Sequence, residues 1–168
     1  MNQTFRVAVA ALLCVGVAAC AQKTTVKQPE TTPERQASTE RATSGKYTRD
    51  SLDTDACLRQ RVVYFDFDKS EIKPEFQAQM ACHAEYLRQF PDARVSLEGN
   101  ADERGTREYN LGLGERRGNA VQSALSAAGA SSGQLNVVSY GEERPTCKEH
   151  NEGCWGKNRR VEIVYTAK

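Results

Sequence analysis

The hydrophobic positions of this chain recur with two different periods after about residue 60. Short runs rich in β-branched and aromatic residues, or alternating apolar with polar residues, predict strands over 62–67, 94–99, 135–140 and 160–165. Spacings of three and four predict helices from Pro74 to Pro91 and from about Thr106 to Gly129. The resulting order, βαβαββ, predicts an α+β sandwich in which helices cover one face of a four-stranded mixed sheet.

The N-terminal pattern is different and predicts export. Residues 1–6 carry one positive charge, and the apolar run Val7 to Gly16 is shorter than the roughly 20 residues that a membrane span requires. The next residues, 17–20, read Val-Ala-Ala-Cys and are similar to a bacterial lipobox. We therefore expect a signal peptide over 1–19 and lipidation of Cys20, with an ordinary signal peptide as the alternative. Ala21 in place of Asp favours the outer membrane.

Residues 20–50 are rich in Thr, Gln, Glu, Pro and Lys and nearly lack large apolar side chains. Such a segment buries too little surface to offset the entropy of ordering, so it predicts a disordered tether. About 29 flexible residues have a root-mean-square span of roughly 30 Å. A single folded domain is then expected over 51–168.

Bulk composition narrows the class of partner. The chain has 168 residues, 39% of them hydrophobic and 27% charged, and these values are typical of one soluble domain. Its formal net charge is only +1. A nucleic-acid partner held by the overall field of the protein is therefore not expected.

Four cysteines remain if Cys14 is removed with the signal peptide and Cys20 carries lipid. An even number in an oxidising compartment favours two disulfides among them, and three connectivities are possible. The short loop between Cys147 and Cys154 favours that pair, which would leave Cys57 with Cys82. A zinc site built from Cys147, His150 and Cys154 is the alternative.

The segment from Gly99 to Val121 reads GNADERGTREYNLGLGERRGNAV. It resembles the OmpA-like peptidoglycan-binding domain family, and within it the lipoprotein members. The family pattern is met at these positions: Gly99, Asp102, Glu103, Arg104, Gly105, Thr106, Tyr109, Asn110, Leu113, Gly114, Arg116 and Arg117. The segments VYFDFDKSEI, VSYGEERP and KNRRVEIVY also agree in order.

The resemblance implies a protein that tethers the outer membrane to the cell wall by binding peptidoglycan non-covalently, with no cofactor. The ligand would be the diaminopimelate of the stem peptide, and protein partners would include TolB and TolA. The free end of diaminopimelate is a zwitterion, which requires one anion and one cation in the receptor. Asp102 and Arg117 supply this pair, because an Asp accepts from an ammonium and an Arg binds a carboxylate with two N–H groups. Gly105 would permit the tight turn between them.

By the same resemblance, further side chains would line the pocket, namely Phe67, Asp68, Arg104, Asn110 and Leu113. Phe67 and Leu113 could instead belong to the core, and Asn110 could fix the loop. Asn158 and Arg159 are interpreted as structural support. The chain departs from the family pattern at Ala101 and, more strongly, in the loop from Thr146 to Gly156, TCKEHNEGCWG.

The sequence bears on two other classes of function, an enzyme and a lipoprotein that anchors a protein complex. An enzyme is not expected, because the two histidines, His83 and His150, do not form a nucleophile-histidine arrangement, and Asp66 with Asp68 is weak evidence for a glycosidase pair. His83 is expected to be a packed or solvated side chain. A lipoprotein that holds a periplasmic regulator or an assembly complex against the wall would share the tether and pocket, so it remains the alternative.

Overall fold

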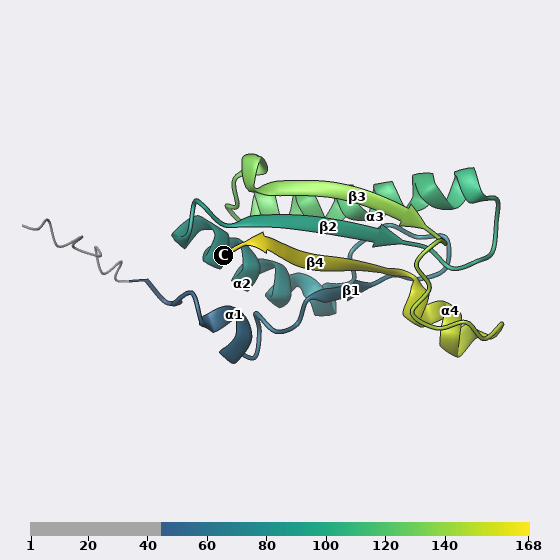
Figure 1. Cartoon of the computed structure of the whole chain (residues 1–168), viewed down its shortest axis with the longest axis horizontal. Helices are drawn as coiled ribbons and strands as arrows, with labels where there is room; N and C mark the ends of the chain where they lie inside the picture. The colour runs from purple at the N-terminus through teal and green to yellow at the C-terminus, as the bar shows by residue number, and fades with distance from the viewer. Residues whose placement is uncertain (1–44) are drawn as a thin grey trace, which may run out of the picture. The chain divides into compact units, whose positions relative to one another are not determined.

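The computed structural model describes residues 45–168. The predicted signal peptide, Cys20 and residues 20–44 of the expected tether lie outside the described residues. Four strands form one mixed sheet in the order β1-β4-β2-β3, as Figure 1 shows. Their bounds are β1 Val62–Tyr64, β2 Arg94–Asn100, β3 Leu135–Gly141 and β4 Arg160–Ala167. The central strand β4 is antiparallel to β1 and β2, whereas β2 and β3 are parallel. The predicted four-stranded mixed sheet is confirmed.

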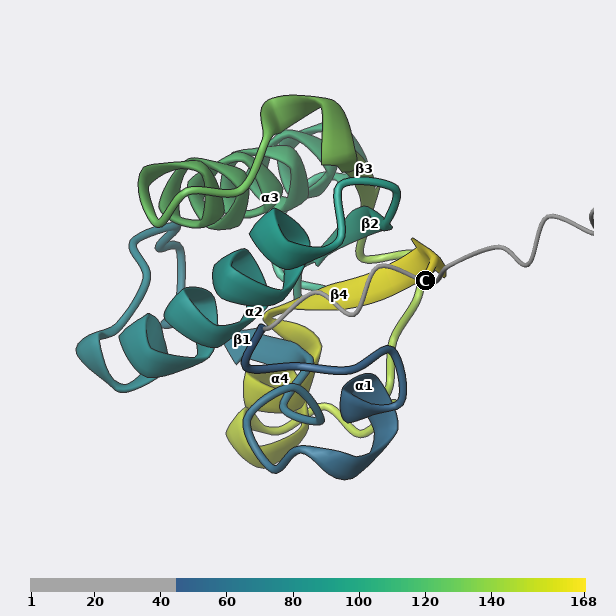
Figure 2. The same ribbon diagram turned by 90° about the vertical axis from the view of Figure 1, so that its left-hand side faces the viewer.

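Two long helices, α2 and α3, lie side by side on the same face of the sheet (Figures 1 and 2). The helical segments are α1 Ser51–Thr54, η1 Pro74–Phe76, α2 Gln77–Gln89, α3 Arg107–Ala127, η2 Ser132–Gln134 and α4 Glu152–Asn158, where η marks a 3-10 turn. No helix among residues 45–168 has the length and apolar character needed to cross a membrane. The short helices α1 and α4 were not predicted, since neither shows an apolar period long enough to be recognised.

The core fills the space between the helices and the sheet. Its fully buried members include Leu97 on β2, Ile163 on β4, Leu87 on α2 and Leu125 on α3. Each such side chain contributes roughly 1.5–3 kcal/mol on burial, which explains why the alternating strand pattern and the helical spacing together predicted the layers. The rigid sheet and the start of α3 then position the loops that follow β1 and β2.

The first strand is shorter than the predicted 62–67. Phe65 still donates its backbone N–H to the carbonyl of Arg159 (2.9 Å), but Phe67 is 54% exposed. Asp68 adopts φ 57°, a left-handed conformation that turns the chain away from the sheet. Phe65 is therefore still a core residue, whereas Phe67 belongs to the loop after β1.

Packing begins before the expected domain start at Ser51. Tyr47 is buried against Tyr86 of α2, with ring centroids 6.2 Å apart. Its backbone N–H donates to Oε1 of Gln89 (3.0 Å), and its carbonyl accepts from Nε2 of the same side chain. The chain thus joins the domain at the C-terminal end of α2, a contact that a tether-like composition did not predict.

Both disulfides favoured by the cysteine spacing are present. Cys57 bonds to Cys82, which ties the turn before β1 to α2, and Cys147 bonds to Cys154, which closes the loop leading into α4. The zinc alternative is wrong, because the two thiols it needs are bonded to each other. No cluster of metal-binding side chains occurs within the described part of the chain.

His83 is fully buried in α2, as a packed side chain. Its Nε2 lies 2.9 Å from the carbonyl of Gln60 and therefore donates, so Nδ1 accepts from the hydroxyl of Tyr165, also at 2.9 Å. Burial lowers the pKa of His83, and the nearby positive charge of Arg61 adds to this effect. His83 is therefore a neutral structural residue at neutral pH.

Candidate functional site

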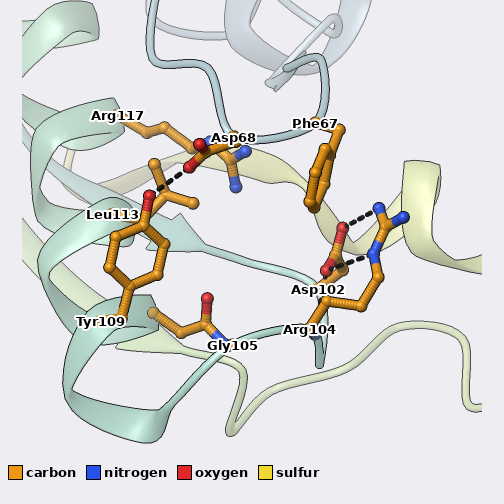
Figure 3. A pocket seen from close by; sticks show the side chains of 9 residues that line it. Phe67, Asp68, Asp102, Arg104, Gly105, Tyr109, Leu113 and Arg117 are labelled. Carbon is orange, nitrogen blue, oxygen red and sulfur yellow. Dashed lines mark hydrogen bonds and ion pairs between the residues drawn. The ribbon is translucent and has the colours of Figure 1, made fainter.

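A pocket of about 210 Å³ opens beside the start of α3, beyond the ends of β1 and β2 (Figure 3). It is lined by Phe67, Asp68, Asp102, Arg104, Gly105, Tyr109, Asn110, Leu113 and Arg117. The structure thus brings all seven predicted binding residues to one cavity. Gly105 and Tyr109 belong to the same family motif, although neither was assigned to the pocket.

Asp102 follows β2 and supplies the anion of the pocket. Only 4% of it is exposed, and its oxygens accept from Arg104 and Arg159. Burial alone would raise the pKa of this carboxyl, but the hydrogen bonds from the two arginines outweigh it and hold the pKa below its usual value. Asp102 is therefore ionised at neutral pH.

Arg104 pairs with both carboxylate oxygens of Asp102, as the dashed lines in Figure 3 show. Its Nε and Nη2 donate to the two carboxylate oxygens at 3.1 and 2.7 Å. The same guanidinium lies over two aromatic rings, with Cζ 4.0 Å from the centroid of Phe67 and 4.2 Å from that of Trp155. These contacts hold it electrostatically in addition to the ion pair.

Arg117 supplies the cation, and it is completely buried. It donates from Nε to the carbonyl of Lys69 (2.8 Å), from Nη1 to that of Asn100 (2.8 Å) and from Nη2 to that of Asp66 (3.2 Å). Burial lowers its pKa to about 10, so it stays charged at neutral pH. A guanidinium has five N–H groups, and these contacts use three of them. Arg117 is thus a structural tie as well as a pocket residue.

The turn between the two charges depends on Gly105. Its φ of 120° is accessible to glycine and strained for other residues. Thr106 then caps α3, because its hydroxyl accepts from the backbone N–H of Tyr109 at 3.2 Å. The Tyr109 hydroxyl in turn donates to Asp68, which links α3 to the loop after β1 across the pocket (Figure 3).

The alternatives for the wall residues are resolved by their burial and contacts. Phe67 is mostly exposed and belongs to the rim, not to the core. Leu113 is buried and lines the cavity as an apolar wall. Asn110 borders the pocket, and its side chain donates to the carboxylate of Glu142 in the loop after β3.

Asn158 and Arg159 lie outside the pocket lining and support it. Arg159 donates to Asp102 (3.1 Å) and to the carbonyl of Phe65 (3.0 Å). The Asn158 carboxamide oxygen accepts from the backbone N–H groups of Thr146 and Cys147, which fixes the disulfide loop. The residues that sequence reasoning missed are Glu152 and Trp155 of α4, whose contacts with Arg104 cross about 50 positions of sequence.

The fold is a mixed sheet with helices on one face, and its pocket brings a buried carboxylate and a buried guanidinium together. Residues 64–159 match the model of the OmpA family. The chain therefore belongs to the OmpA family.

Individual relatives support this family membership. The chain is 51% identical over 114 residues to a peptidoglycan-associated lipoprotein of Pseudomonas putida, covering 67% of this chain and 68% of that one. It is 48% identical over 107 residues to the protein of the same name from Pasteurella multocida, covering 64% and 71%. The names of these relatives describe association with peptidoglycan and no catalytic activity, in agreement with the expectation of a binding protein rather than an enzyme.

Solved structures of related proteins share this fold. The crystal structure of the peptidoglycan-associated lipoprotein from Burkholderia pseudomallei superposes with a TM-score of 0.67 at 43% identity, covering 68% of this chain and 98% of that one. The C-terminal domain of Helicobacter pylori MotB shares the fold at 20% identity, with a TM-score of 0.58 over 63% of this chain and 83% of that one.

Proposed function

We propose that this protein is an outer-membrane lipoprotein that binds peptidoglycan non-covalently through the diaminopimelate of the stem peptide. The observation that carries the proposal is the pairing of ionised Asp102 with cationic Arg117 in the lining of one cavity. The relatives that are named peptidoglycan-associated lipoproteins support the same ligand.

The pocket fits each part of this ligand. The ammonium of diaminopimelate pairs with Asp102, and its neighbouring carboxylate accepts from the two remaining N–H groups of Arg117. The start of α3, with its positive end of the helix dipole, adds to the attraction for the carboxylate. The methylene chain of the ligand packs against Leu113 and Phe67. Because the pocket is only about 210 Å³, it takes one amino-acid side chain rather than a length of polymer.

The best test changes the ligand and leaves the protein intact, because Arg117 also ties the fold together. Binding of a stem peptide ending in diaminopimelate is compared by calorimetry with the same peptide amidated at the free carboxylate. We expect a loss of tenfold or more, which is the value of one charge-assisted pair. Equal affinity for both peptides refutes the assigned pocket.

A second test uses sedimentation with purified peptidoglycan. Asp102→Asn keeps the shape of the side chain and removes its charge, so the variant is expected to stay in the supernatant. Glu149→Gln is the matched control, because its carboxylate lies in the disulfide loop and contacts Asn151. Pelleting of Asp102→Asn at the wild-type level argues against an ionic ligand contact at this position.

The anchor and the protein partners complete the proposal. We infer that lipid on Cys20 holds the chain in the outer membrane and that residues 20–50 let the domain reach the wall. Palmitate labelling that is lost in Cys20→Ala tests the anchor.

We further propose TolB and TolA as partners, and crosslinking in cells followed by co-purification tests them. Recovery of another regulator or assembly complex without Tol proteins favours the alternative function.

A further inference from the structure

The Asp102 carboxylate has no vacant acceptor position in the present structure. Its Oδ1 accepts from the backbone N–H and from Nε of Arg104, both at 3.1 Å. Its Oδ2 accepts from Nη2 of Arg104 at 2.7 Å and from Nη1 of Arg159 at 3.1 Å. A carboxylate offers about four lone-pair positions, so an arriving ammonium must displace one of these donors.

Arg104 is the donor that can leave. Its side chain is 30% exposed at the pocket, whereas that of Arg159 is 9% exposed. Arg159 is also tied to the carbonyl of Phe65 at 3.0 Å and to Glu152 at 2.6 Å, so moving it would break three contacts at once. The Arg104 side chain is bound to Asp102 through one edge of its guanidinium.

A second carboxylate already faces the other edge of Arg104. Nη1 lies 3.4 Å from Oε2 of Glu152, and Cζ lies 4.2 Å from the ring centroid of Trp155. Both residues belong to α4, which Asn151 caps and the disulfide between Cys147 and Cys154 closes. Trp155 is fixed further by donating from Nε1 to Glu103 at 2.7 Å.

We propose that ligand binding transfers the Arg104 guanidinium from Asp102 to Glu152, so that Glu152 and Trp155 are positioning residues of the binding pocket. This inference rests on the proposed function and adds a mechanism to it. The exchange leaves no charge unpaired, because the ligand ammonium replaces Arg104 at Asp102 while Arg104 keeps Glu152 as its partner. Without Glu152, a displaced Arg104 would lose its partner carboxylate, and its release would be opposed.

The first arm of the test measures affinity. A stem peptide ending in diaminopimelate is titrated by calorimetry into the full chain purified in detergent micelles. Glu152→Gln is expected to bind about tenfold more weakly, as for the loss of one charge-assisted contact. Glu149→Gln, the matched control in the same loop, is expected to bind like wild type. Equal binding by Glu152→Gln and wild type overturns the proposal.

Glu152 also contacts Arg159, so it could affect binding without Arg104. A double-mutant cycle separates the role of Glu152 as partner of Arg104 from such an effect through Arg159. Arg104→Gln removes the donor that the ligand ammonium must displace from Asp102, so we expect it to bind more tightly than wild type. In that background Glu152→Gln is expected to have no further effect. Weaker binding by Arg104→Gln, or a tenfold effect of Glu152→Gln that persists without Arg104, overturns the exchange.

Trp155 gives a spectroscopic readout, because it is the single tryptophan of the chain and contacts Arg104. Its emission is expected to change during the titration of wild type and to stay constant in Arg104→Gln. The same change in both proteins contradicts movement of Arg104. If wild type itself does not bind the peptide, the proposed function fails. If it binds but the variants do not differ, only this inference fails.

Discussion

Replacing Arg117 by alanine tests both the proposed role of this residue as the cation that binds the ligand and its structural role in connecting two loops. In the folded protein its guanidinium joins the loop after β1, through the carbonyls of Asp66 and Lys69, to the end of β2, through that of Asn100. Alanine leaves all three carbonyls without this donor. We therefore expect loss of stability together with loss of binding.

The magnitude follows from these contacts. A hydrogen bond to a charged group contributes about 1.5–3 kcal/mol, so three of them contribute about 4.5–9 kcal/mol before offsets. Alanine also removes a buried cation whose desolvation costs several kcal/mol, and the open pocket lets water reach the freed carbonyls. We expect a net loss of about 3 kcal/mol in the free energy of unfolding. For a domain of this size, that corresponds to a Tm lower by about 12 °C.

Urea unfolding followed by circular dichroism measures this loss, with Arg116→Ala as the matched control. Arg116 is the adjacent residue of α3, exposed and in contact with the ring of Tyr109 at 5.5 Å, so its removal is expected to change stability by less than about 0.5 kcal/mol. If Arg117→Ala unfolds at the same urea concentration as Arg116→Ala, the structural role assigned to its three hydrogen bonds is refuted.

Three further predictions concern stability. Replacing Cys57 and Cys82 by serine is expected to cost about 3.5 kcal/mol from loop-closure entropy, measured by urea unfolding; an unchanged midpoint contradicts it. Because the pKa of His83 is lowered in the folded protein, only the unfolded state binds a proton at this residue just below pH 6.5. The free energy of unfolding is therefore expected to fall by up to about 1.4 kcal/mol for each pH unit that the pH is lowered there. His83→Gln is expected to remove this dependence of Tm on pH. Gly105→Ala, at φ 120°, is expected to cost about 1–3 kcal/mol; a Tm equal to wild type refutes the strain.

The layers of the fold could be predicted because their signals are local. Leu87 and Leu125 lie at helical spacings, and Leu97 alternates with polar neighbours, so each pattern reports which face is buried. The packing of Tyr47 could not be predicted in the same way. It depends on Gln89, about 40 residues away, and its neighbours have the composition of a disordered segment.

In the candidate site too, the contacts within one continuous segment could be predicted, whereas those between distant segments could not. Asp102, Gly105 and Arg117 lie in one continuous motif, so their proximity follows from a loop leading into a helix. The contacts of Trp155 and Glu152 with Arg104 connect segments that meet only after the sheet has formed. Sequence alone also could not reveal that the guanidinium of Arg117 binds three carbonyls, because those partners are backbone atoms.

The attachment of the chain at Tyr47 determines how the domain would carry a mechanical load. Tyr47 contacts the end of α2, close to where β2 begins, whereas the pocket follows the end of β2, so the two points lie toward opposite ends of the sheet (Figure 1). A pull between them runs along the strands and shears their hydrogen bonds together instead of opening them one by one. The same protein pulled at its two termini would be loaded differently, because Lys168 pairs with Asp53 of α1. In the proposed tether between wall and membrane, the strands are thus aligned with the expected tension.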